Sequence, residues 1–292
     1  MLRNFLRTAL RSLAKNASVS SLNIIGLSAG MTAAVFIFLW VQNELSFDSY
    51  HPNAERVYRI TTFLPSANWT WETTPLSLGP VLTREEPGLE TLTRMQPAYS
   101  FALRVNNTPF AEKHAAYVDS NWFKVFHYDF IKGSPADFFS QPYSLLMTQS
   151  KAKKYFGDKD PIGNIVQVDS VAYRVAAVVK DAPANSSFQA DMLVPLDALL
   201  SQPDQRKNET SWGNFNFLTF LRLRPTASPA TVAANITRIM KANRKDASDQ
   251  MSLMPLTGMH FETGLTSGGS AIEHANRKTV YIFSILGVFL LV

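Results

Sequence analysis

A long apolar run lies between Lys15 and Glu44 and contains no charged residue. Its central part, 19–41, consists mainly of Leu, Ile, Val, Phe, Ala, Met and Gly. A helix rises about 1.5 Å per residue, so this part would span roughly 34 Å, enough to cross a bilayer with its backbone satisfied. We therefore expect a transmembrane helix over 18–43. A buried core helix and a cleaved signal peptide are the alternatives, but no small-residue cleavage site follows the run.

The residues before this run place apolar and basic side chains on opposite faces of a helix. The basic positions are Arg3, Arg7, Arg11 and Lys15. This pattern predicts an amphipathic lead-in over 1–17 that lies in the membrane interface; the alternative is that the charges serve only as an orientation signal. By the positive-inside rule we expect the N-terminus in the cytoplasm and 44–278 outside it, with Trp40 as an anchor at the outer interface.

Two further features concern the membrane segments. Gly26 and Gly30 form a Gly-x-x-x-Gly pattern, which is typical of a helix-packing face but is also common by chance in such segments. A second apolar run follows Lys278 and continues to the last residue. It reaches only about 20 Å as a helix, so we expect 279–292 to be the start of a second transmembrane helix, truncated at the end of the chain.

The region 44–278 has the mixed pattern of an α+β domain. Alternating apolar and polar positions predict strands at 57–63, 100–105, 115–119, 144–148, 165–169, 172–180, 189–194, 217–224 and 251–256. Asp169-Ser170 predicts a tight hairpin turn. The predicted helices are 76–86, 148–156, which Gly157 ends, and 228–243, which opens with Ser228-Pro229. Because these elements lack regular βαβ alternation, we expect an α+β fold of two lobes, joined by a long loop over 201–210.

The net charge of +5 comes mainly from the lead-in. All 23 acidic residues and 24 of the 28 basic residues lie in 44–278, which is therefore nearly neutral. A nucleic-acid binder usually carries a basic face on its folded domain, so no nucleic-acid partner is expected. The chain contains no cysteine, which excludes disulfides, thiolate metal sites and a cysteine nucleophile.

No arrangement of residues along the chain indicates catalysis. The nucleotide-binding pattern Gly-x-x-x-x-Gly-Lys-Ser/Thr and the hydrolase patterns Gly-x-Ser-x-Gly and His-Glu-x-x-His do not occur. The histidines are scattered singly, and each is expected to be structural or on the surface. We therefore expect no catalytic residue, no cofactor and no metal site. The aromatic runs 69–71 and 122–126 are compatible with a ligand groove, although packing in the core or between subdomains is the expected role.

Six stretches follow one another in a characteristic order. They are 5–16 (FLRTALRSLAKN), 22–31 (LNIIGLSAGM), 47–60 (FDSYHPNAERVYRI), 155–164 (YFG with DPIGN), 178–188 (VVKDAPANSSF) and 255–261 (PLTGMHF). In this order they resemble permease subunits of ABC transporters of the MacB/FtsX type, particularly the Bacteroidetes-like versions. The family often has histidine where this chain has Ser187.

The resemblance implies a bacterial inner-membrane protein with four membrane helices and a periplasmic core domain of two mixed α/β lobes. It implies a separate cytoplasmic ABC ATPase as partner, a permease dimer, contact with membrane lipid and a possible periplasmic partner. Some members of the family transmit ATP-driven motion to the periplasm, a role called mechanotransmission, in place of pumping. The alternative is a membrane sensor with an extracytoplasmic ligand-binding domain, which would require a concave pocket with converging polar groups.

Overall fold

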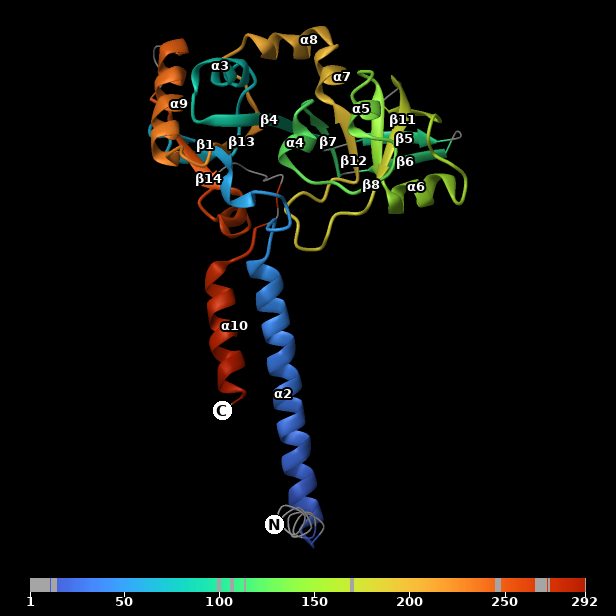
Figure 1. The fold of residues 1–292 in the computed structure, drawn as a ribbon, viewed down its shortest axis with the longest axis vertical. Helices are drawn as coiled ribbons and strands as arrows, with labels where there is room; N and C mark the ends of the chain where they lie inside the picture. Colours follow the sequence, from blue (N-terminus) through green and yellow to red (C-terminus); the bar gives the residue numbers. More distant parts are fainter. Residues whose placement is uncertain are drawn as a thin grey trace. The chain divides into compact units, whose positions relative to one another are not determined.

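The structure, a computed structural model, describes residues 11, 15–98, 101–105, 108–112, 114–168, 171–244, 248–265, 272 and 274–291. The chain divides into two compact units (Figure 1). The first unit combines the two ends of the chain, Met1–Ser46 and Asn276–Val292, and the second is Phe47–Ala275.

The first unit contains two apolar helices, α2 (Ala17–Leu45) and α10 (Arg277–Phe289). Helix α2 is long and apolar enough to cross a membrane, and most of its side chains are exposed. The two helices pack side by side, with the rings of Trp40 and Phe283 edge to face at 5.2 Å (Figure 1). Gly287 permits this close approach, because a Cβ there would lie 3.1 Å from the Ile37 side chain.

The helices of the second unit are short, apart from α9. They are η1 (Ala54–Arg56), α3 (Leu78–Glu85), α4 (Trp122–Val125), α5 (Pro135–Phe138), α6 (Gln149–Phe156), α7 (Leu196–Leu200), α8 (Pro203–Arg206), η2 (Lys207–Glu209), α9 (Pro229–Asn243) and η3 (Leu256–Phe261). Local signals set the ends of the two helices that the sequence predicts best. The Ser228 hydroxyl accepts the Thr231 N–H at 3.5 Å to begin α9, and α6 ends at Gly157, whose φ is 60°. The predicted loop 201–210 is partly wrong, because α8 and η2 lie within it.

Fourteen described strands form one mixed sheet. They are β1 (Val57–Leu64), β2 (Trp69–Trp71), β3 (Thr74–Pro75), β4 (Leu89–Ala98), β5 (Phe101–Val105), β6 (Thr108–Glu112), β7 (Ala115–Val118), β8 (Phe130–Lys132), β9 (Ser144–Thr148), β10 (Ile165–Val168), β11 (Val171–Val179), β12 (Met192–Pro195), β13 (Phe215–Leu223) and β14 (Gln250–Pro255). Their order is β14-β1-β13-β4-β7-β12-β9-β11-β10-β5-β6, with β2, β3 and β8 off this path. Only the β7–β12 and β9–β11 pairs are parallel among the described strands. The expected α+β class is therefore confirmed.

Three large hydrophobic clusters of described residues hold the helices on the sheet, and a smaller fourth cluster packs α7 against β13. Helices α3 and α9 pack on β1, β4, β13 and β14 through residues such as Leu82, Ile236 and Leu221 (Figure 1). Helix α6 packs near β5, β9, β10 and β11 through Tyr155 and Ala152. The third cluster is rich in aromatic rings and includes Trp122, Phe126, Phe138, Phe188 and Phe220. The aromatic run 122–126 is thus core, as expected.

The main strand that the sequence pattern misses is β4, which lies between β13 and β7. Polar residues break its alternation, and Pro97 lies near its end. One of these residues, Arg94, becomes part-buried by forming a paired interaction with Asp119, with Nε 2.6 Å from Oδ2. The predicted turn Asp169-Ser170 lies outside the described residues; the strands on either side pair antiparallel, with Val168 opposite Val171.

Candidate functional site

The basic residues expected at the membrane interface are only partly described. Arg3 and Arg7 lie outside the described residues. Arg11 and Lys15 are helical and exposed. Trp40 is half-buried against Phe283, five residues before the end of α2. The interfacial roles of these residues stay predictions.

The two glycines of the expected packing face differ in their surroundings. A Cβ at Gly30 would lie 3.4 Å from the Leu290 carbonyl oxygen, so this glycine faces the C-terminal apolar segment. A Cβ at Gly26 would have no other atom within 4 Å. The glycine packing face therefore stays a prediction, with Gly26 open to a further neighbour.

The most distinctive polar cluster lies where the chain leaves α2. Asp48 comes three residues after the helix ends, at a φ of 56°. Its N–H donates to the Asn185 carbonyl oxygen at 2.9 Å, and its Oδ1 accepts the Ser187 N–H at 2.8 Å. Both bonds join residues 47–51, the outgoing segment, to residues 185–188. Asp48 is fully buried, so the outgoing segment is anchored inside the domain.

Two aromatic residues strengthen this anchor. The Tyr50 hydroxyl lies 2.8 Å from the Ser186 Oγ. The His51 Nδ1 accepts the His127 N–H at 3.1 Å, so a neutral His51 carries its proton on Nε2. The His51 ring lies 5.2 Å from that of Phe126 and is 3% exposed. The outgoing segment therefore joins the aromatic core as well as residues 185–188.

The segment that leads back to α10 is anchored through η3. The N–H of Ala275, two residues before α10, donates to the His260 carbonyl oxygen at 2.7 Å. The ring of His274 places Nδ1 2.8 Å from the Met259 carbonyl oxygen. On the outgoing side, Phe47 stacks on the His260 ring with centroids 3.4 Å apart and planes 7° from parallel. Helix η3 therefore contacts both connecting segments.

Residues 47–51, 185–188, η3 and 274–275 together form what we call the junction. Burial controls the protonation of its side chains. It raises the pKa of Asp48, against hydrogen bonds from Ser187. It lowers the pKa of His51 to about 3, with a further contribution from the nearby His127. It raises the pKa of Tyr50 to about 12. His51 and Tyr50 are therefore neutral at physiological pH, and the junction is a largely buried, hydrogen-bonded joint.

In the sequence, the three parts of this junction are visible only as separate stretches of the family resemblance. The parts are 47–60, 178–188 and 255–261, and the structure brings them into contact. The histidines were expected to be structural or on the surface, and His51 and His260 both have structural contacts in the junction. The residue at position 187 takes part through its backbone N–H, which any residue other than proline supplies. Among the described residues, no group of three or more His, Asp or Glu side chains is arranged to hold a metal ion.

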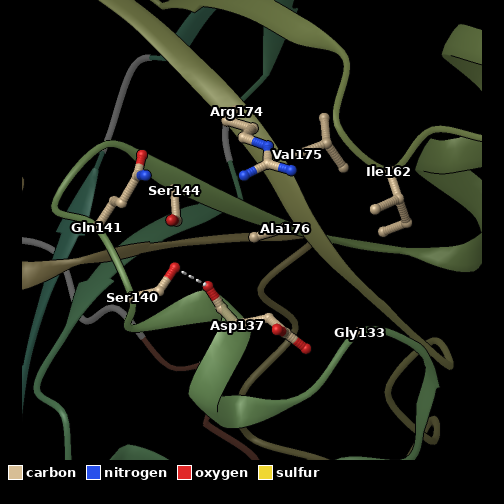
Figure 2. A pocket seen from close by; sticks show the side chains of 9 residues that line it. All are labelled: Gly133, Asp137, Ser140, Gln141, Ser144, Ile162, Arg174, Val175 and Ala176. Atoms are coloured by element: carbon tan, nitrogen blue, oxygen red, sulfur yellow. Dashed lines mark hydrogen bonds between the residues drawn. The ribbon is translucent and has the colours of Figure 1, made fainter.

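A small polar cavity lies away from the joint, between α5, β9 and β11 (Figure 2). Figure 2 shows Asp137 of α5 and Arg174 of β11 on opposite sides of it. The Asp137 carboxylate accepts the Ser134 hydroxyl at 2.7 Å, and its carbonyl oxygen accepts the Ser140 hydroxyl at 2.7 Å. The volume is about 230 Å³, below the range of about 300–1,000 Å³ usual for small-molecule pockets.

Comparison with solved structures identifies domains of the same architecture. A domain of a permease protein from Porphyromonas gingivalis aligns with a TM-score of 0.61 at 23% identity, covering 70% of this chain and 92% of that one. The periplasmic region of MacB from Actinobacillus actinomycetemcomitans aligns with a TM-score of 0.52 at 15% identity, covering 70% and 90%. The extracellular domain of the noncanonic ABC-type transporter YknZ from Gram-positive bacteria gives 0.51 at 15%, covering 68% and 99%.

At these identities the structural likeness shows a shared fold. A comparison with curated proteins gave no match. The sequence profile of the MacB-like periplasmic core domain matches residues 20–239, most of the chain. Together with the apolar helix α2, this match indicates an inner-membrane protein with a periplasmic domain. The chain therefore belongs to the MacB-like periplasmic core domain family, the permease components of ABC-type transporters.

Proposed function

We propose that this chain is a permease subunit that couples a separate cytoplasmic ABC ATPase to work in the periplasm, by export or by mechanotransmission. Its N-terminus lies in the cytoplasm, and residues 44–278 lie in the periplasm. The subunit acts as a dimer in contact with lipid, and its outer domain has a periplasmic partner. The chain itself performs no chemistry; its role is to carry movement.

The junction is the observation that carries this proposal. Only two residues separate the end of α2 from the buried Asp48, and only Asn276 separates Ala275 from the start of α10. The outgoing segment contacts residues 185–188 and η3, and the segment that leads back to α10 contacts η3. Because a short, hydrogen-bonded connection transmits displacement better than a flexible one, movement of either helix would reach the core of the outer domain.

The charge pattern supports the orientation. The lead-in before α2 is basic, whereas the first charged residue after the apolar run is the acidic Glu44, next to the last residue of α2. The absence of cysteine makes this orientation simple to test. We expect a membrane-impermeant maleimide to label Asp204→Cys, an exposed position in α8, in intact spheroplasts. It should label Lys15→Cys only after lysis, and the reverse pattern would contradict the orientation.

Coupling is tested by lengthening the connection. A flexible Gly-Ser insertion between Ser46 and Phe47 should leave both units folded but loosen the joint. The control carries the same insertion between Ser66 and Ala67, in the exposed turn between β1 and β2. The chain is first purified in detergent with the ATPase that accompanies it. An environment-sensitive dye at Asp204→Cys then reports on the outer domain when ATP is added.

We expect the dye signal to respond to ATP in the parent chain and the control, and not in the junction insertion. An unchanged response in the junction insertion would contradict the coupling role. If no ATPase accompanies the chain, the permease function itself is wrong and the sensor alternative gains support.

A further inference from the structure

The aromatic run 69–71 has no role in the junction. Strand β2 carries Trp69 and Trp71 and pairs with β1, where Trp69 lies opposite Leu64 and Trp71 opposite Thr62. Because positions two apart point to the same side of a strand, both indoles lie on one face. Trp69 is 50% exposed, so the expected core role is wrong for this residue. A strand off the main path of the sheet leaves such a side chain uncovered.

An open groove begins at this strand. Its volume is about 380 Å³, within the range of about 300–1,000 Å³ usual for small-molecule sites. Its lining residues come from β2, the segment that follows it, the two residues before β13, and the start of β13; they are Trp71, Thr73, Gly213, Asn214, Phe215 and Asn216. The rings of Trp71 and Phe215 meet edge to face at 5.4 Å, which gives the groove an aromatic wall.

Neutral polar groups stand beside this wall. The side chains of Thr73 and Asn216 make no hydrogen bond within the described part of the chain, and Asn216 is exposed. The Asn214 amide donates to the Asn208 side-chain oxygen, which fixes its orientation and leaves its own oxygen free to accept a further bond. A carboxamide offers both donors and acceptors, so these residues can match a ligand that carries hydroxyl groups.

The groove has no charge with which to select an ion. None of the six lining residues is charged. The nearby Arg244 guanidinium lies 5.1 Å from the centroid of the Phe215 ring and already pairs with Asp249. A purely hydrocarbon ligand would bury the Thr73 and Asn216 polar groups without partners, which is costly. The lining therefore suits a neutral ligand with an apolar face and a polar edge.

We propose that this groove binds a pyranose ring of a neutral glycan. The axial C–H groups of a β-linked pyranose form an apolar face that stacks on the indole of Trp71. Its equatorial hydroxyl groups lie around the ring edge, where Asn214, Asn216 and Thr73 supply partners. The exposed Trp69, on the same face of β2, extends the stacking surface toward a second sugar.

Calorimetry tests the proposal on the whole chain, held in a detergent without a sugar headgroup, such as an alkyl amine oxide. The probes are a tetrasaccharide of β-1,4-linked N-acetylglucosamine and cellotetraose, which lacks the acetamido groups. Trp71→Ala should weaken binding about tenfold, the upper end of what one aromatic stack contributes. Asn216→Ala should weaken it severalfold. Tyr143→Ala removes another exposed aromatic ring, outside the groove, and should bind like the parent chain.

A second variant distinguishes a loss of binding from a folding defect. A Cβ at Gly213 meets no atom within 4 Å, so Gly213→Leu fits the fold and projects into open space. It should block binding while Trp71 and Asn216 stay in place. The proposal is overturned if neither sugar binds at millimolar concentration, or if Gly213→Leu and Asn216→Ala both bind as the parent chain does.

Discussion

Asp48 offers the sharpest test of how the junction is built. Its Oδ1 accepts the N–H of Ser187, which is itself buried, and its backbone lies in the left-handed region. Asp48→Ala would leave that N–H without a partner, which costs about 1–3 kcal/mol. Alanine in the left-handed region costs about 1–2 kcal/mol more. We expect a total loss of about 2–5 kcal/mol in the free energy of unfolding.

Asp48→Asn is the matched control. Asparagine keeps an acceptor oxygen and tolerates the left-handed region, so the loss should stay within about 1 kcal/mol. The assay is thermal unfolding in detergent. The melting temperature of a domain of this size shifts by about 2–4 °C for each kcal/mol of stability lost. The alanine variant should therefore melt about 4–20 °C below the parent chain. Equal losses in both variants would refute the reasoning, because neither the acceptor nor the backbone conformation would then matter.

The same residue makes a prediction about pH. Burial raises the pKa of Asp48 above its ordinary value of 3.8, so the folded state binds this proton more tightly than the unfolded state. Its contribution to stability is complete below pH 3.8 and is lost as the pH rises through the folded pKa. As the pH rises through this range, the melting temperature of the parent chain should therefore fall relative to that of Asp48→Asn. A constant difference across the range would show that burial does not disfavour the charge.

Two further predictions concern other buried groups. The pKa of His51 is lowered to about 3, so its contribution to stability is present above pH 6.5 and is lost as the pH falls through about 3. His51→Gln should therefore make the melting temperature depend less on pH between pH 6.5 and about 3. An unchanged pH dependence of the melting temperature would contradict this. Arg59 and Glu72 form a buried ion pair, with Nη1 2.9 Å from Oε2. Glu72→Gln should cost about 3–5 kcal/mol by denaturant titration, whereas Arg59→Met combined with Glu72→Leu should recover most of it, and equal losses would contradict this.

Much of the fold was accessible from local signals. Ser228-Pro229 begins α9 and Gly157 ends α6, because capping and backbone conformation act within one turn of a helix. Strands with clear alternation or apolar runs, such as β9 and β11, were predicted within one residue. Strand β4 was missed because its polar residues find their partners elsewhere in the chain. Arg94, for example, pairs with Asp119, which lies 25 positions away.

The junction was out of reach for a different reason. Asp48 and Ser187 are 139 positions apart, and nothing local in either stretch shows that they meet. The family resemblance marked both stretches, but without saying what they do. The sequence also did not show which aromatic run would be buried. Run 122–126 lies in the core, whereas Trp69 stays exposed on a strand off the main sheet path.

The sequence by itself determined the long apolar helix, the basic segment before it and the α+β character of the outer domain. These properties depend on composition and on periodicity within a few turns or strands, which each segment carries alone. Tertiary structure decided which polar groups became buried partners, how the outgoing and returning segments came to share η3, and which aromatic rings stayed open to solvent. The physical reason is that burial and hydrogen bonding between distant segments depend on the packing of the whole domain, which no single stretch of residues specifies.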